Sequence, residues 1–560
     1  MIDVIKKYIS LLSVKYWLFV VALAFFRTVS LYFYDGQGGI KCTRVLILLA
    51  DFLVSVIVFA IFIILLRVGI TKFTHKLFDD EVTINKWLAY GVLFFGWLPN
   101  LIVKYPGAMC WDSYRMLHYY FREGVLDAHH SELYSLIIGK SVQFFEQIGH
   151  INLALLTIVI GQYLLSVFVF GYSIQLFGRM KIRKWVIGLV IAFYLLCPYI
   201  VGYLGVVIKD VPYSVLIFLI TILLIEFSLE PYEFCRSGVR LFLLFFSILF
   251  SCLLRKNGIY VIGLSSLFFI PAIIKSKGSK QFLIPFLTIV VSCLSVFVVK
   301  YFIGCRYEVR PGSIAEALSV PFQQTARYVK YHEKDVTDEE RVAIDDVLIY
   351  KTLADRYKPG VSDSVKDEYL KDDTKLPAYF KVWFKQFFRH PFCYIAATWD
   401  QNLYLFIPSV EFNNISLYLD YDVVVYECGK ICRMSYGGCK SYEHIFDKPF
   451  IFEKFTSWAI EIYKQLHRPI PLGIMSNISV NTYILLFLFY SMFMEKKTWQ
   501  YVFPIILLSV LCVIIGPVIH GQPRYMFPVI YSMPSLIVYT LVSFKKEPTE
   551  DCQDNMIDEG

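Results

Sequence analysis

Charged residues are scarce in this chain: Asp, Glu, Lys and Arg make up 18% of its 560 residues, while hydrophobic residues make up 57%. Soluble globular proteins carry about 25% charged residues. The apolar residues are concentrated in repeated runs of about 20 residues, the length that crosses a bilayer. The composition therefore excludes an ordinary soluble protein and predicts an all-α polytopic membrane protein.

Several other signals are missing from the sequence. No internal repeat is visible, and the two halves show no matched pair of interrupted spans, a feature of many secondary transporters. No cleavable signal peptide is evident, because the first apolar run, 16–34, is long enough to span and lacks a small-residue cleavage site. The net charge of +8 does not indicate nucleic-acid binding, since the basic residues lie largely in short loops between apolar runs.

The hydrophobic runs predict about twelve transmembrane helices. They cover residues 16–34, 45–67, 87–103, 151–175, 185–205, 211–229, 239–254, 258–275, 282–302, 474–494, 501–519 and 523–544. The runs 239–254 and 258–275 are separated only by a short polar turn, so they can form a hairpin. Arg27 and Asp51 lie within the first two runs, where an isolated charge is costly, and Asp51 can pair with Arg27.

The basic residues determine the expected orientation. If the N-terminus is cytoplasmic, every cytoplasmic loop is basic, as the positive-inside rule requires. We therefore expect both termini to be cytoplasmic. The chain then divides into an N-terminal transmembrane module (1–303) with a first outer loop (104–150), an extracytoplasmic domain (304–472), C-terminal transmembrane helices (473–544) and a cytoplasmic tail (545–560).

The extracytoplasmic domain reads as mainly helical. Residues 313–331 carry apolar side chains at helical spacing. Thr337 and Glu340 match a capping box, which predicts a helix from there to about Arg356. Residues 417–443 alternate in short runs and are compatible with a small strand pair.

Three cysteines cluster in that last stretch: Cys428, Cys432 and Cys439. With His444 nearby they give a weak metal signal, because their spacing matches no usual zinc site. Disulfide bonds and free thiols are equally compatible with the sequence.

The first outer loop is the main candidate for a functional site, because it places acids, histidines and aromatic residues between two spans. Asp112 lies a few residues beyond the third span, where the reduced dielectric suits a general base toward a hydroxyl, or a ligand for a divalent cation. His129 or His130 could share a proton, ligate a metal or bind a phosphate. A solvated loop would account for the same residues, so spacing alone leaves both interpretations open.

Three polar pairs lie at span ends on the same predicted outer face: Lys209-Asp210, Arg255-Lys256 and Arg524-Tyr525. The positive-inside rule disfavours basic residues there. Snorkelling to the headgroups would explain each of them singly. An anionic ligand at the outer leaflet, such as a lipid phosphate, would explain the whole set together with the acidic loop.

These features together resemble the GT-C class of integral-membrane glycosyltransferases, which use polyprenyl-phosphate-linked sugars. The resemblance rests on Tyr105-Pro106-Gly107…Trp111-Asp112-Ser113, Asp127-Ala128-His129-His130-Ser131-Glu132-Leu133-Tyr134, Lys209-Asp210 and Arg524-Tyr525. More closely, the chain from about Leu93 to Tyr539 is similar to an uncharacterised Gram-positive bacterial family of that class, on residues 255–258, 319–327 and 362–366. It departs from the family at His129-His130-Ser131, where relatives usually read His-Pro, which leaves open which histidine takes the family role.

The resemblance implies a GT-C-like helix arrangement and an inverting transfer at the outer face of a bacterial cytoplasmic membrane. A hexosyl or pentosyl group would pass from a polyprenyl-phosphate donor to an envelope glycan, such as a cell-wall polysaccharide, or to a glycolipid. Asp112 would accept the proton of the acceptor hydroxyl, with His129 and His130 as further catalytic candidates. A divalent cation is compatible with the class and is not required by it.

The same resemblance implies the substrate-binding residues. Arg524 and Arg255, with Lys256 and Lys209, would neutralise the leaving phosphate. Asp210 and Tyr525 belong to the same set of candidates. From the outer domain, Gln323, Gln324 and Arg327 would face the active-site cleft and bind the acceptor.

Two other functions use the same features. A flippase or transporter for a lipid-linked glycan would need polar groups through several spans, whereas the span interiors are mostly Leu, Ile, Val and Phe. A polysaccharide polymerase or ligase would share the lipid-phosphate site, and analysis of product chain length would distinguish it from a glycosyltransferase that adds single sugars.

Overall fold

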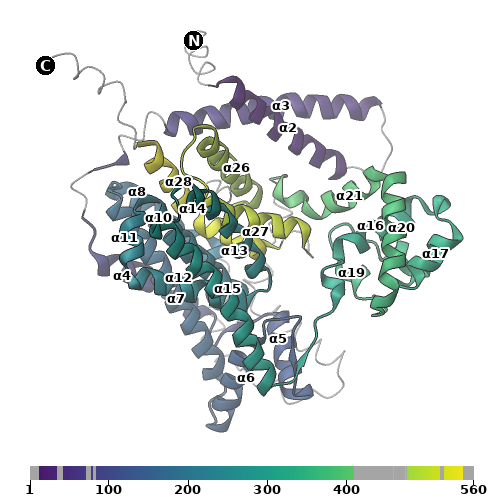
Figure 1. Ribbon diagram of the computed structural model, residues 1–560, viewed down its shortest axis with the longest axis horizontal. Helices are drawn as coiled ribbons and strands as arrows, with labels where there is room; N and C mark the ends of the chain where they lie inside the picture. The colour runs from purple at the N-terminus through teal and green to yellow at the C-terminus, as the bar shows by residue number, and fades with distance from the viewer. Residues whose placement is uncertain are drawn as a thin grey trace.

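The structure, a computed structural model, describes residues 12–34, 42–70, 77–79, 83–408, 476–516 and 522–545, with Trp458 and Gly473 between them. It consists mainly of helices, in a large bundle with a smaller helical group beside it (Figure 1). The expected strand pair at 417–443 lies outside the described residues, as do Cys428, Cys432 and Cys439.

Every predicted span overlaps a helix, although the span 258–275 is divided between α13 and α14 and the span 185–205 is covered by α8 only to Leu196. The bundle contains α2 (Val14–Tyr34), α3 (Cys42–Val68), α4 (Lys86–Val103), α7 (Asn152–Arg179), α8 (Lys184–Leu196), α10 (Asp210–Leu229), α12 (Gly238–Leu254), α13 (Asn257–Ser266), α14 (Ile270–Lys275), α15 (Lys280–Arg306), α26 (Ile478–Met494), α27 (Phe503–Ile515) and α28 (Phe527–Lys545). Within the described residues, seven helices are long and apolar enough to cross a membrane, and five further apolar helices are shorter. The chain is therefore a helical membrane protein, while the count of twelve spans stays a prediction.

Helix α10 is the centre of the bundle. It is apolar on all sides, the pattern of a helix surrounded by protein, and 89% of its most apolar window is buried. It packs against α7, α12 and α28. Helices α2 and α3 pack mainly on each other and leave most of their apolar surface exposed, as expected of helices that face lipid.

The predicted ion pair within the first two spans is confirmed. Arg27 pairs with Asp51 and also donates a hydrogen bond of 2.8 Å to Ser55 Oγ. Thr28 Oγ1 donates to the other oxygen of Asp51 at 3.0 Å. Each charge is therefore compensated between α2 and α3, which is how charges are tolerated inside a membrane span.

The polar turn after α12 brings two helices into contact, as predicted. The Gly258 amide donates to the Arg255 carbonyl at 3.0 Å, and α13 packs against α12. A Cβ atom on Gly258 would lie 3.2 Å from the Cys252 Cα atom, so glycine permits the close approach. This tight turn holds Arg255 at the end of α12.

The smaller helical group is the described part of the predicted 304–472 domain, here called the inserted domain. It begins after α15 and contains α16 (Ser319–Tyr331), α17 (Asp338–Asp345), α18 (Tyr350–Arg356), α19 (Asp363–Lys366), α20 (Leu376–Arg389) and α21 (Pro391–Asn402). Its own hydrophobic core includes Phe322, Ile344, Leu353 and Tyr379. Helix α21 joins the domain to the bundle, since Trp399 Nε1 donates to Ser30 Oγ at 2.8 Å and Asn402 Nδ2 donates to the Ile514 carbonyl at 3.1 Å.

The predicted capping box of the inserted domain is confirmed, but the predicted length of the helix that it begins is wrong. Thr337 accepts from the Glu340 amide, and the Glu340 side chain accepts from the Thr337 amide. The expected continuous helix to Arg356 is interrupted between α17 and α18. Asp345 Oδ1 accepts a hydrogen bond of 2.8 Å from the Tyr350 amide, so a side chain takes over an amide that a continuous helix would pair with a carbonyl.

Candidate active site

Two short parallel strand pairs fasten the first loop, residues 104–150, to distant parts of the chain. β1 (Ala108–Met109) pairs with β3 (Val206–Val207), just before α10. β2 (Leu126–Asp127) pairs with β4 (Val309–Arg310), at the entry to the inserted domain. The loop is thus held between the bundle and the inserted domain.

Asp112 lies in the first turn of α5 (Trp111–His118), where a helix N-terminus favours a negative charge. The backbone before it is tightly packed. Gly107 has φ +146°, and a Cβ atom there would lie 2.9 Å from Val159 Cγ2 of α7. After it, Ser113 Oγ donates to the Val207 carbonyl. These contacts fix the position of the carboxylate relative to the bundle.

Two cations from distant segments contact Asp112. Lys209, immediately before α10, places its Nζ atom 3.3 Å from Asp112 Oδ2. Arg524, in the turn η10 (Pro523–Met526) that precedes α28, lies 3.1 Å from the same oxygen. All three side chains are at least four-fifths buried. Three of the sequence candidates therefore form one contact group.

The contacts extend through Arg524 to a second carboxylate. Arg524 lies 3.5 Å from Asp210 Oδ2, and Arg255 Nε lies 2.9 Å from Asp210 Oδ1. The Tyr525 ring lies beside both guanidinium groups, 5.4 Å from that of Arg524 and 5.5 Å from that of Arg255, within cation–π range. Asp210, Arg255 and Tyr525 thus join the same group.

Of the two candidate histidines, His130 reaches this group. Its Nδ1 atom lies 3.4 Å from Lys209 Nζ. Because an ammonium group can only donate, Nδ1 accepts and the ring proton belongs on Nε2. That Nε2 atom is buried and has no hydrogen-bond partner among the described residues. An unsatisfied buried donor costs about 1–3 kcal/mol, so this nitrogen favours a bound acceptor.

His129 contacts the inserted domain instead. Its Nδ1 atom lies 3.5 Å from Glu316 Oε1, and Glu316 Oε2 lies 2.7 Å from Lys366 Nζ. Its amide donates to Asp127 Oδ1 at 2.9 Å. Of the two histidines, His130 is therefore the one that contacts Lys209, the partner of Asp112, while the choice of the functional histidine stays a prediction. We call Asp112, His130, Lys209, Asp210, Arg255 and Arg524 the polar network.

The electrostatics of the polar network favour an anion. Burial would raise the pKa of the Asp112 carboxyl, but Lys209 and Arg524 outweigh it and hold that pKa well below its usual range. The network then holds three cations, two carboxylates and one histidine. A divalent cation at Asp112 would have to displace Lys209 and Arg524, whereas an anion would be attracted by them.

Lys256 occupies a neighbouring position. Gly312 lies so close to it that a Cβ atom there would be 3.2 Å from Lys256 Nζ and 3.3 Å from the Ala128 carbonyl oxygen. Burial lowers the pKa of Lys256. This lysine therefore lies where the first loop meets the inserted domain, on the same side as His129.

Three predicted acceptor-binding residues lie on α16 and make contacts within the inserted domain. Gln323 Nε2 donates to the carbonyls of Lys358 and Val361, at 3.2 and 2.8 Å. Gln324 donates to Thr398 Oγ1 and accepts from Trp383 Nε1, while Arg327 pairs with Asp400 and donates to the Tyr357 hydroxyl. The structure does not bring these three residues into the polar network, and their contacts hold α16 against its neighbours.

Tyr134 is a buried polar residue near His130 that the sequence interpretation did not include among the site candidates. It lies in the first turn of α6 (Glu132–Gln147), about one helical turn after His130, and is 3% exposed. Its hydroxyl has no hydrogen-bond partner among the described residues, and burial raises its pKa well above the usual range. The spacing of four residues from His130 is the signal that could have found it. No comparable spacing pointed to Glu316, which contacts His129, or to Lys366, which contacts Glu316.

The buried state of His130 predicts a pH-dependent stability. Burial, and then Lys209, lower the pKa of His130 from 6.5 to about 2, so the folded protein keeps it neutral. Below pH 6.5 the unfolded chain binds a proton that the folded chain does not, so stability falls as pH falls, by up to about 1.4 kcal/mol per pH unit. We expect the melting temperature in detergent to drop less steeply from pH 6.5 to 5 in His130→Gln than in the wild type. Equal slopes would contradict a buried neutral His130, and exposed His150→Gln serves as the control.

Comparison with known sequences places the polar network within a matched region. A protein family matches residues 98–554, and its description reads "Family of unknown function (DUF6020)". No curated protein matches the chain. The matched region contains every residue of the polar network and the whole inserted domain.

Proposed function

We propose a function for this chain, which belongs to the DUF6020 family of unknown function: it is a membrane glycosyltransferase. It transfers a sugar from a polyprenyl-phosphate donor to a hydroxyl of an envelope glycan or glycolipid, as the GT-C resemblance implies. The observation that supports this most is the contact of the Asp112 carboxylate with Lys209 and Arg524, at 3.3 and 3.1 Å. Displacement of a phosphate by a hydroxyl is accelerated when a base for the hydroxyl and cations for the leaving phosphate are held in one site.

The donor phosphate would bind to the cations of the polar network. Arginine binds phosphate through two parallel hydrogen bonds, and both Arg524 and Arg255 are largely buried, where such bonds are stronger. The Nε2 atom of His130 and the hydroxyl of Tyr134 supply two further donors for phosphate or sugar oxygens. The network lies at helix ends, so the polyprenyl chain can remain in the bilayer beside the bundle.

The reaction is a single displacement. The acceptor oxygen attacks the anomeric carbon, and Asp112 takes the proton of the acceptor hydroxyl. The bond between the anomeric carbon and the phosphate oxygen breaks, and its electron pair leaves with the phosphate. The products are an inverted glycoside and polyprenyl phosphate, whose developing charge Lys209, Arg255 and Arg524 stabilise.

Phosphate binding would also activate the base. In the ligand-free site the two cations keep the pKa of Asp112 low, which makes it a weak proton acceptor. A bound phosphate becomes a second anionic partner for Lys209 and Arg524. The pKa of Asp112 then rises in the complex, so the carboxylate becomes an effective base when the donor is present.

The test is a comparison of envelope glycans from cells that lack the gene and from cells that carry it again on a plasmid. We expect one sugar substituent to disappear on deletion and to return with the wild-type gene. Unchanged glycans would contradict the proposal. A change in glycan chain length without loss of a substituent would favour a polymerase, and transport of lipid-linked glycan in vesicles without sugar transfer would favour a flippase.

A further inference from the structure

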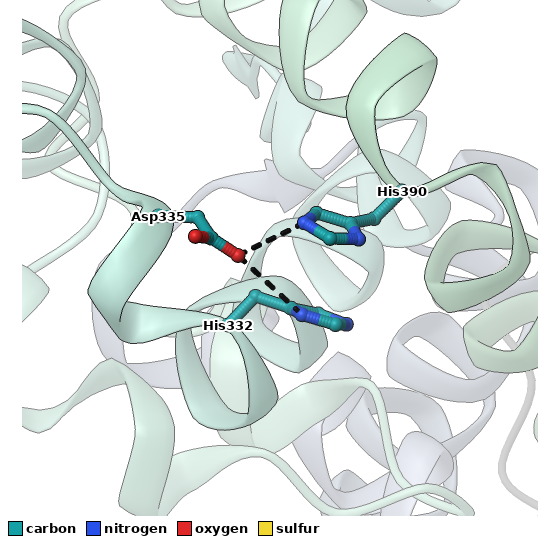
Figure 2. Close-up of side chains that lie close together, drawn as sticks. All are labelled: His332, Asp335 and His390. Atoms are coloured by element: carbon teal, nitrogen blue, oxygen red, sulfur yellow. Dashed lines mark hydrogen bonds and ion pairs between the residues drawn. The ribbon is translucent and has the colours of Figure 1, made fainter.

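The inserted domain holds a second cluster of titratable side chains: His332, Asp335 and His390 (Figure 2). His332 follows α16, Asp335 ends the turn η6 (Glu333–Asp335), and His390 lies between α20 and α21. One nitrogen of each histidine and one oxygen of Asp335 all lie within 4.8 Å of one another. The glycosyltransferase proposal uses none of these residues.

The distances in this cluster resemble those of a metal site. His390 Nε2 lies 2.9 Å and His332 Nδ1 lies 3.8 Å from the same oxygen, Asp335 Oδ2. A separation of 3.8 Å is too long for a hydrogen bond. In a tetrahedral zinc site with ligand bonds of about 2.0–2.2 Å, neighbouring ligand atoms are roughly 3.3–3.6 Å apart, between the two observed values.

Each imidazole ring has one nitrogen near the same oxygen, Asp335 Oδ2. Figure 2 shows the two imidazole rings one above the other, each with a nitrogen turned toward Asp335. The rings are stacked, with centroids 3.9 Å apart and planes inclined by 16°. The Tyr328 ring lies 5.5 Å from each imidazole ring and packs beside them. Because a ring nitrogen binds a metal ion in the plane of its ring, both imidazoles would have to rotate out of this stacked arrangement to bind one ion.

The positive charge of the neighbouring residue Arg389 is already paired. Arg389, next to His390, lies 3.0 Å from Glu340 Oε1 and also donates to the backbone carbonyl of Asp335. Glu340 is buried and receives Lys385 at 3.3 Å as well. The side-chain carboxylate of Asp335 is therefore left to the two imidazoles, while its backbone is held in place. A held carboxylate between two histidines is a preorganised ligand set.

We propose that His332, Asp335 and His390 bind a divalent transition-metal ion, with Zn²⁺ as the expected ion. Imidazole nitrogen and carboxylate oxygen are both zinc ligands, and three protein ligands leave a fourth position for water. The cluster is about one-third exposed or more, so an ion can enter from solvent. The bound ion joins the end of α16 to the α20–α21 corner and stiffens the domain next to its attachment to α2.

The test is metal binding by the full-length protein in detergent after treatment with a chelator. Titration with Zn²⁺ should fill this site in the wild type, and Co²⁺ should give the visible absorption of a tetrahedral complex. His390→Ala and Asp335→Ala should each weaken this binding by at least about 10–100-fold, since loss of a partner that only supports a ligand already costs that much. His150→Ala, which removes an exposed histidine from a different part of the chain, should bind like the wild type.

A further variant distinguishes the proposed site from zinc binding at the cysteine cluster. Replacement of Cys428, Cys432 and Cys439 by Ser should leave the Co²⁺ spectrum of the protein unchanged. In that Cys-to-Ser background, His390→Ala should still cause the loss of one bound ion. Absence of Zn²⁺ and Co²⁺ binding in the wild type would overturn the proposal, and this measurement depends on no variant. Binding of equal stoichiometry and affinity in wild type, Asp335→Ala and His390→Ala would overturn it as well.

Discussion

Asp112→Asn is expected to abolish sugar transfer and at the same time to strengthen the binding of polyprenyl phosphate. Loss of a positioned general base costs about 10²–10⁴-fold in rate. The same change removes the carboxylate that lies 3.3 Å from Lys209 and 3.1 Å from Arg524. Both cations are then available to the phosphate, and we expect a gain in affinity of about tenfold, which equals ~1.4 kcal/mol.

Two measurements check these opposite effects. Polyprenyl phosphate, which is released whichever sugar the donor carries, is titrated into the protein in detergent micelles. Transfer is followed as restoration of the envelope glycan in the deletion strain. Asp355→Asn, which removes an exposed carboxylate of α18, is the matched control and should behave as the wild type in both assays.

The two results are independent of each other. Wild-type transfer by Asp112→Asn would exclude Asp112 as the base. Loss of transfer with unchanged or weaker phosphate binding, in a protein that elutes as a single folded species, would contradict competition between Asp112 and the phosphate for Lys209 and Arg524.

Arg524→Gln is expected to lose both phosphate binding and transfer. Arg524 is 8% exposed and contacts both carboxylates of the polar network. Truncation of one partner in a buried, hydrogen-bonded charge pair costs about 2–5 kcal/mol, or roughly 30-fold to several thousand-fold in affinity. Asp210 keeps its 2.9 Å contact with Arg255, so the helix ends retain part of their ion pairing.

Arg524→Lys separates charge from geometry. Lysine keeps the positive charge but lacks the planar fork that binds phosphate through two bonds, so we expect an intermediate loss of affinity. Arg306→Gln removes an exposed arginine at the end of α15 and is the matched control. Polyprenyl phosphate affinity equal to the wild type in folded Arg524→Gln would contradict a phosphate site at the polar network.

Local features of the structure could be predicted from the sequence. Hydrophobic runs of span length became helices at the predicted positions. The capping box of Thr337 and Glu340 is present, because both of its hydrogen bonds join residues three apart. The length of the helix that follows could not be predicted, since the Asp345 side chain competes with the helical pattern at the Tyr350 amide.

The candidate site was predicted only as separate pieces. Asp112, Lys209 and Arg524 were each marked by a charge at a span end, and they do lie together. The sequence could not choose between His129 and His130, because adjacent residues in a loop point in different directions that depend on the path of the backbone. Gln323, Gln324 and Arg327 were placed in the site by resemblance, whereas their contacts lie within the inserted domain.

The sequence by itself determined that this is a helical membrane protein, where its apolar helices lie and that Arg27 and Asp51 can neutralise each other. Hydrophobic runs and helix capping depend on residues that are close in sequence, so they do not depend on how the helices pack. Only the tertiary structure decided that Asp112 meets Lys209 and Arg524, that His130 rather than His129 joins them, and that His332 and Asp335 face His390. These contacts join residues far apart in the chain, so they exist only after packing of the helices has brought particular helix ends together.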